Sequence, residues 1–147
     1  MLIIGCGNLL RGDDGLGIHL IKELGKLHLP ENVKLIDAGT ISIDMLFQME
    51  AVDKVIIVDA VEGGLEPGNI YRLTKEDLAS PSANPISLHE LKLEHTLKIG
   101  EKILGDKFPS EIIIFGVEVG EVKESIALSP KVEKSLPRLI DLLLREL

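Results

Sequence analysis

Residues 2–17 read LIIGCGNLLRGDDGLG, and no other stretch says as much about the fold. The stretch opens with apolar residues typical of a buried strand, and a glycine-rich turn follows. Beyond the turn, apolar residues recur at helical spacing, which predicts a helix over residues 14–24. The side chains on its inward face are Leu16, Leu20, Ile21 and Leu24. A strand that leads through a tight turn into an amphipathic helix is the first unit of an α/β fold.

The rest of the chain repeats this alternation. Apolar runs predict strands over residues 33–37, 55–58, 69–73 and 111–117. Helical patterns predict helices over residues 42–50, 87–104 and 130–147. Only about nine residues separate the third strand from the fourth, whereas a parallel crossover needs roughly a dozen or more. We therefore expect one α/β sandwich domain over residues 1–147, with the fourth strand antiparallel and near an edge.

The composition fits a single domain with an aliphatic core. The 147 residues are 45% hydrophobic but include only three Phe, one Tyr and no Trp, so valine, isoleucine and leucine must fill the interior. Sixteen Lys and Arg against twenty-four Asp and Glu give a formal net charge of −8. This balance argues against a nucleic acid or an anionic membrane as partner, since either needs a basic stripe. A cation or a basic partner segment fits better, although acidic surfaces also occur for solubility alone.

The single cysteine and the lack of long apolar segments point to the cytosol. Cys6 has no partner for an internal disulfide and lies in an apolar run, so we expect a packed thiol rather than a nucleophile. The first residues lack the apolar core of a signal peptide. No apolar stretch approaches the roughly 20 residues that span a bilayer. We therefore expect a cytoplasmic protein.

Carboxylates gather where the predicted strands end. Asp13 and Asp14 follow the first strand, Asp37 closes the second and Asp59 closes the third. Ligands bind beyond the carboxyl ends of the strands in parallel α/β sheets. Several like charges at one edge destabilise a fold unless a metal ion or another cation relieves them. In the simpler interpretation each aspartate caps a helix or a turn, which we favour for Asp13 and leave open for Asp59.

His89 strengthens the metal hypothesis. It falls in the first turn of a helix that a capping box at Ser87 begins, and it shares a helix face with Leu93 and Leu97, which must pack on the sheet. Because the strand after this helix should run parallel to the first three, the helix must begin at the edge where the aspartates lie. A histidine on an apolar face is often a core residue. Together with two carboxylates, however, it makes a ligand set suited to nickel, zinc or iron.

The glycines after the first strand do not make a nucleotide site. The pattern G-x-G-x-x-G needs a third glycine at a position that is Leu10 here. The turn also carries Asp13 and Asp14 where a pyrophosphate would bind, and their charge would repel it. The patterns G-x-S-x-G, H-E-x-x-H and C-x-x-C are absent from the sequence.

The first turn resembles the N-terminal signature of the nickel–iron hydrogenase maturation endopeptidases. The likeness continues in order through nearly the whole chain. The segments that carry it are GCGNLLRGDDGLG at 5–17, DAGT at 37–40, IVDA at 57–60, PG at 67–68, SLHE at 87–90, GV at 116–117 and LSP at 128–130. The first segment is long and fairly specific, and the others are persuasive in combination.

This resemblance implies a three-layer α/β/α sandwich around a mixed five-stranded sheet of order 2-1-3-5-4, with strand 4 antiparallel. It implies an endopeptidase that removes the C-terminal extension of an immature hydrogenase large subunit once nickel is installed. The nickel would be supplied by the substrate and recognised by Asp14, Asp59 and His89. The substrate would also contact Gly39 and Thr40.

A mechanism follows from these residues. The metal arrives with the substrate, and the two carboxylates and the imidazole complete its coordination near the strand ends. The attacking group is water, because no activated serine or cysteine is evident, and Asp37 is a candidate for an assisting base. The alternative is a non-enzymatic checkpoint or chaperone that recognises the nickel centre and cleaves nothing.

Overall fold

The computed structural model describes residues 1–79, 88–120 and 122–147, and it describes the side chains of the long helix α4 (Leu88–Leu104) from Lys92 onward. The capping box expected over residues 87–90 lies outside the described residues.

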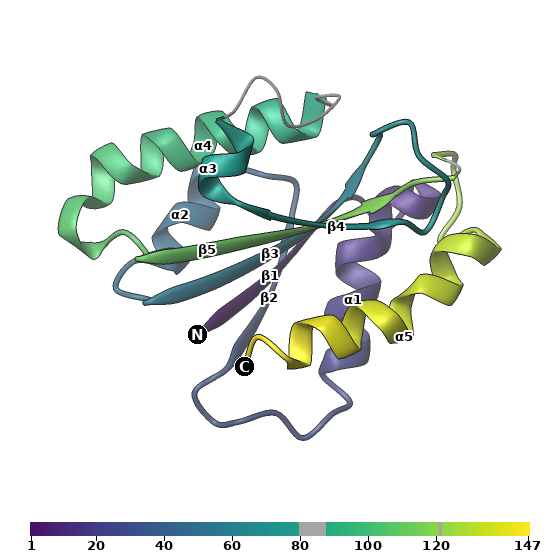
Figure 1. Ribbon diagram of the computed structural model, residues 1–147, viewed down its shortest axis with the longest axis horizontal. Coiled ribbons are helices and arrows are strands. Elements are labelled where there is room, and N and C mark those ends of the chain that lie inside the picture. Colours follow the sequence, from purple (N-terminus) through teal and green to yellow (C-terminus); the bar gives the residue numbers. More distant parts are fainter. Residues whose placement is uncertain (80–87, 121) are drawn as a thin grey trace.

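A mixed sheet of five strands forms the centre of the molecule (Figure 1). In chain order the strands are β1 (Leu2–Cys6), β2 (Lys34–Gly39), β3 (Lys54–Val61), β4 (Ile70–Thr74) and β5 (Glu111–Glu118). Their spatial order is β2-β1-β3-β5-β4, and all neighbours pair in parallel except β4, which pairs antiparallel with β5 at the edge. The predicted order and the reversed fourth strand are confirmed. The short connection from β3 to β4 leaves no room for a crossover, which explains the reversal.

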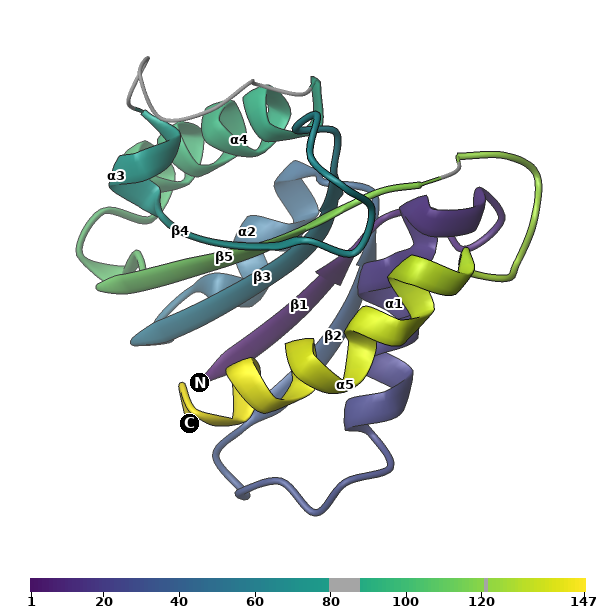
Figure 2. The same ribbon diagram turned by 45° about the vertical axis from the view of Figure 1, so that its right-hand side comes forward.

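Helices cover both faces of the sheet and complete a three-layer sandwich (Figures 1 and 2). One face carries α1 (Leu16–Leu24) and α5 (Pro130–Leu144), and the other carries α2 (Ile43–Met49), α3 (Lys75–Leu78) and α4. Two short 3-10 turns, η1 (Gly12–Gly15) and η2 (Gly105–Lys107), precede α1 and follow α4. None of the described helices is both long enough and apolar enough to cross a membrane.

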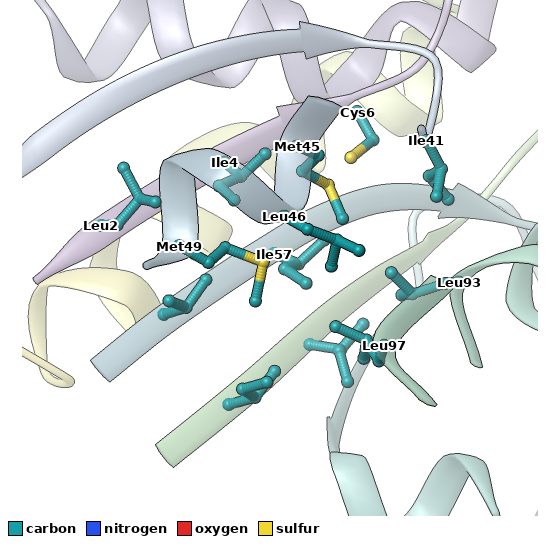
Figure 3. Close-up of a cluster of buried hydrophobic side chains, with 13 residues drawn as sticks. Leu2, Ile4, Cys6, Ile41, Met45, Leu46, Met49, Ile57, Leu93 and Leu97 are labelled. Carbon is teal, nitrogen blue, oxygen red and sulfur yellow. The ribbon is translucent and has the colours of Figure 1, made fainter. Parts of the chain in front are cut away.

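The core has two halves because side chains alternate between the two faces along each strand. Ile57 of β3 packs under α2 and α4, whereas Ile56 and Val58 pack under α1 and α5. Figure 3 shows the half under α2 and α4, where aliphatic side chains of the sheet meet the methionines of α2. The Cys6 thiol is buried in this cluster, which confirms that it is a packed thiol.

Two glycines let the first helix lie very close to the first strand. A Cβ on Gly17 of α1 would come within 2.3 Å of the Cys6 carbonyl oxygen, and a Cβ on Gly5 would lie 2.2 Å from the Gly17 carbonyl oxygen. Both distances are far shorter than a van der Waals contact, so neither position has room for a side chain. This close packing holds η1 against the carboxyl end of the sheet, where it contacts β3.

Two details differ from the sequence-based predictions. The sequence patterns do not predict α3, although Thr74 and Asp77 form a capping box at its start, in which each side chain accepts a hydrogen bond from the other residue's amide. The last helix, expected over residues 130–147, ends at Leu144, and Leu147 beyond it is 40% exposed.

Candidate active site

A small cavity opens at the carboxyl ends of the parallel strands. It encloses about 80 Å³ between the turn after β1, the segment after β2, the end of β3 and the beginning of α4. Among the described residues, those that line it are Gly7, Asp14, Thr40, Ile41, Asp59 and Lys92. This is room for an ion and a few ligating atoms rather than for a large organic ligand, whose pockets measure roughly 300 Å³ or more.

Asp59 reaches the cavity from β3. Its side chain is 4% exposed, and Oδ1 accepts a hydrogen bond from the Ala60 amide at 2.9 Å. Because Asp59 follows Ile57 at two-residue spacing, it points toward the sheet face that α4 covers. The residue in register with it on β5 is Gly116, which has no side chain to crowd the carboxylate.

The turn after β1 brings Asp14 into the same cavity. Gly7 has a φ of 126°, and a Cβ there would overlap the Asp14 carbonyl oxygen at 1.8 Å, so only glycine can make this turn. The Asp14 side chain is 6% exposed, and its Oδ2 accepts a hydrogen bond from the Asn8 amide at 3.1 Å. Two buried carboxylates from distant parts of the chain therefore meet in one cavity.

Asp13 points elsewhere, and the prediction that it caps its own helix is wrong. Neither η1 nor α1 has a side-chain cap hydrogen bond, and Arg11 is the N-cap residue of η1. Instead, the fully buried Asp13 carboxylate accepts hydrogen bonds from Ser129, at the start of α5, and from the Gly120 amide. An aspartate just before a helix is a local signal for a cap, but Ser129 lies 116 residues away.

Asp37 lies two residues before the end of β2 and is not part of the described lining of the cavity. Its side chain is exposed, and Oδ1 accepts a hydrogen bond from the Gly39 amide at 3.0 Å. Strand alternation directs Asp37 toward the α1 face, because Ile36 beside it packs on the α4 face.

Burial raises the pKa of the Cys6 thiol, and the charges of Asp59 and then Asp37 raise it further. The two carboxylates thus bracket β1, and the thiol near them stays protonated.

The residues expected to contact substrate lie at the end of β2, where Gly39 is the last residue of the strand and Thr40 follows it. Thr40 lines the cavity and is exposed at its rim. Gly39 has a φ of 58°, and its carbonyl oxygen accepts a hydrogen bond from the Gly7 amide at 2.7 Å, which ties the end of β2 to the turn after β1. A Cβ on Gly39 would meet nothing within 4 Å, so this glycine serves the backbone conformation and leaves the rim open.

The third predicted ligand, His89, falls in the first turn of α4, and its side chain lies outside the described residues. Lys92 lines the cavity, while Leu93 and Leu97 are buried on the sheet, so α4 starts over the cavity. Among the side chains that the structure describes, no three from His, Cys, Asp or Glu gather as a metal-binding group. Lys92 is a cavity residue that the sequence patterns do not reveal.

Glu118 is a buried carboxylate that the sequence analysis also missed. It closes β5, is 3% exposed, and its Oε2 accepts hydrogen bonds from the Gly63 amide at 2.7 Å and the Tyr71 hydroxyl at 3.2 Å. An acidic residue directly after an apolar strand is the signal that marks Asp59, and it would have found Glu118 too. These contacts anchor the connection between β3 and β4, and Glu118 is outside the described cavity lining.

Comparison with known proteins identifies the family. The family model HycI, described as hydrogenase maturation protease, matches residues 18–146. The hydrogenase 2 maturation protease of Escherichia coli is 31% identical over 135 residues, which cover 90% of this chain and 81% of that protein. The chain belongs to the hydrogenase maturation protease family, and it is an endopeptidase by class. The resemblance stated from the sequence is thereby confirmed.

Two further similarities cover almost the whole chain. The coenzyme F420 hydrogenase subunit delta of Methanothermobacter thermautotrophicus is 36% identical over 160 residues, which cover 100% of this chain and 94% of that protein. The solved structure of the hydrogenase maturating endopeptidase HybD from Escherichia coli matches with a TM-score of 0.86 and 28% identity, over 99% of this chain and 90% of that chain. The sheet order described above is therefore the fold of this family.

Proposed function

We propose that the chain removes the C-terminal extension from the immature large subunit of a nickel–iron hydrogenase after nickel insertion, in the cytoplasm. Asp14, Asp59 and His89 recognise the nickel that the substrate carries. The observation that carries this proposal is the pair of buried carboxylates, Asp14 and Asp59, which line one small cavity in a member of this protease family.

The described lining holds two carboxylates and one lysine, Lys92, so electrostatics favour a further positive charge in the cavity. Two carboxylates that are taken out of water and brought together destabilise each other, and a bound cation offsets both costs. Two carboxylates and one imidazole also leave part of a metal's coordination shell open, which the substrate's own ligands fill. Such a ligand set suits nickel, zinc and iron alike, so the choice of nickel comes from the substrate.

The course of α4 supports His89 as the third donor. Positions 89, 93 and 97 share one face of the helix, and Leu93 and Leu97 are buried against the sheet face that Asp59 reaches. Helical spacing carries position 89 one turn farther along this face, toward the edge of the sheet where the cavity lies.

In the proposed mechanism, binding of the nickel brings the scissile bond to the rim of the cavity, where Gly39 and Thr40 contact the peptide. Water attacks the carbonyl carbon, because the only cysteine of the chain is buried with a raised thiol pKa and offers no thiolate. Asp37, exposed near the end of the adjoining strand and outside the described cavity lining, acts on the peptide beyond the rim. It takes a proton from the water as general base and returns it to the leaving amine as the carbon–nitrogen bond breaks.

Processing of a nickel-loaded precursor tests the proposal. The precursor is incubated with wild type, Asp59→Asn or His89→Ala, and its shortening is followed by intact-mass spectrometry. Both variants are expected to fold and to leave the precursor uncut, because each removes one donor from the nickel shell. Glu118→Gln is the matched control, since it neutralises a buried carboxylate on a neighbouring strand outside the described cavity lining. Cleavage by Asp59→Asn at the wild-type rate would contradict the proposed site.

Membership of a protease family disfavours the non-enzymatic checkpoint. The same incubation decides between the two functions, because only a peptidase shortens the precursor. Formation of a complex without any shortening is the result expected of a checkpoint.

A further inference from the structure

We propose that Asp13 is a positioning residue that clamps the turn carrying Asp14 to the start of α5 through Ser129. Asp13 itself touches neither the cavity nor, on this proposal, the substrate. Its role is to keep the neighbouring carboxylate aimed at the metal. The inference rests on the proposed function insofar as Asp14 recognises nickel.

In the described part of the chain, three short hydrogen bonds to one buried carboxylate form the clamp. Oδ1 of Asp13 accepts from the Ser129 amide at 2.6 Å, and Oδ2 accepts from the Ser129 hydroxyl at 2.7 Å and from the Gly120 amide at 2.8 Å. Asp13 is fully buried, so water does not compete for these bonds. Hydrogen bonds to an ionised carboxylate are among the strongest in proteins, and three of them from two segments fix its orientation.

The Ser129 side chain bonds to Asp13 instead of capping its own helix. It is the N-cap residue of α5, with proline next to it in the first turn, but its side chain makes no cap hydrogen bond. Serine at this position ordinarily accepts a hydrogen bond from an amide of its own helix. Here the hydroxyl donates to Asp13 instead, so the two segments GCGNLLRGDDGLG and LSP, at opposite ends of the sequence, meet in one contact.

The same two regions are joined at further points. Arg11 and Ser125 form a parallel bridge, in which the Gly12 amide donates to the Ser125 carbonyl at 2.6 Å and the Ser125 amide donates to the Leu10 carbonyl at 3.1 Å. Figures 1 and 2 both show residues 122–129, which lead into α5, lying beside the turn after β1. The turn that carries Asp14 is therefore held from outside by the segment that follows β5.

Asp13 and Asp14 are consecutive, so a displacement of the backbone at Asp13 is passed on to Asp14. With the Asp13 carboxylate fixed, the Asp14 carboxylate has a defined direction into the cavity, where Asp59 meets it. Partners that orient a ligating side chain typically contribute about 10- to 100-fold to metal affinity or activity. We expect an effect of this size when the clamp is opened.

The experiment compares Ser129→Ala and Asp13→Asn with wild type and with Ser135→Ala. Ser135→Ala is the matched control, because it removes a buried hydroxyl from the same helix that donates only to the Val132 carbonyl in the described part of the chain. Ser129→Ala keeps the backbone donor of the clamp and is expected to fold even if Asp13→Asn does not. One readout is the affinity for the precursor with and without nickel, and the other is amide hydrogen exchange at residues 12–16.

The clamp variants should lose about 10- to 100-fold in affinity for the nickel-loaded precursor and little for the nickel-free one. Their amides at residues 12–16 should exchange faster, while Ser135→Ala should match wild type in both readouts. An unchanged preference for the nickel-loaded precursor in Ser129→Ala would overturn the proposal. If wild type does not prefer the nickel-loaded precursor over the nickel-free one, the proposed function fails, and the clamp is then tested by hydrogen exchange alone. Faster exchange at residues 12–16 in the clamp variants would support the clamp, and unchanged exchange would overturn it.

Discussion

Replacing Gly17 by alanine should damage both the stability and the activity of the protein. The added Cβ would lie 2.3 Å from the Cys6 carbonyl oxygen, 2.6 Å from the Cys6 nitrogen and 2.7 Å from the Val58 carbonyl oxygen. All three are backbone atoms of central strands, so α1 must move, and restoring ordinary contact takes a shift of about 1 Å. Overpacking of this kind costs about 1–3 kcal/mol, and immobile neighbours favour the upper end.

The same shift would displace η1, which contains Asp14 and leads directly into α1. A misplacement of about 1 Å can cost roughly 100-fold in rate, so precursor cleavage should fall by about that factor even in the folded fraction. Urea unfolding gives the change in the free energy of unfolding, and single-turnover cleavage gives the rate.

Gly25→Ala is the matched control for this prediction. Gly25 follows α1 with a φ of −64°, and a Cβ there would make ordinary contacts at 3.4 and 3.5 Å. Alanine at this position should leave the rate unchanged and alter stability by less than about 1 kcal/mol. If Gly17→Ala is as stable as wild type and cleaves precursor at the same rate, the close contact between α1 and β1 at Gly17 does not hold the site in place.

Three further predictions concern groups that titrate. A hydrogen bond from Arg72, followed by one from Lys54, lowers the pKa of Glu146 below its ordinary 4.5. Glu146→Gln should therefore lower stability by up to about 1 kcal/mol at neutral pH. The pKa of Glu146 is lower in the folded state than in the unfolded state, so the stability difference between wild type and Glu146→Gln should be fully present above pH 4.5. It should vanish as the pH falls through the folded-state pKa, and melting curves recorded across pH can check this. Cys6→Ala should cleave precursor like wild type, and native Cys6 should resist alkylation at pH 8, because burial raises its thiol pKa; rapid alkylation would contradict this. His89 must be neutral to bind nickel, and its ordinary pKa is about 6.5, so affinity for the nickel-loaded precursor should fall below about pH 6; constant affinity from pH 7 to 5 would count against ligation by His89.

The architecture was predictable because its signals are local. Apolar runs mark the strands, and the brevity of the connection between β3 and β4 is enough to reverse the fourth strand. The element that escaped, α3, is a single turn with no buried residues, so it carries no apolar stripe. Its only signal is the capping box from Thr74 to Asp77.

The site was predictable only where a carboxylate ends a predicted strand or lies in the turn that follows it. Asp59 ends an apolar run and Asp14 follows a glycine turn, so the topology rule for parallel sheets brings them together. Asp13 carries the same local signal as a helix cap, yet its partners in the described part of the chain include Ser129 and Gly120. Such long-range pairing leaves no trace in the spacing of nearby residues. Lys92 was missed for the converse reason, because an exposed lysine on a helix looks alike whether or not a cavity lies beside it.

The hydrogen bonds between Asp13 and Ser129 have a consequence for how the protein is made. During translation the turn that holds Asp13 and Asp14 leaves the ribosome well before Ser129, which lies 116 residues after Asp13. A growing chain can fold from its N-terminal side before synthesis ends. It has both cavity carboxylates by then, but it lacks the donors that set the direction of one of them. Emergence of Ser129 is therefore the earliest moment at which the geometry around Asp14 can be complete.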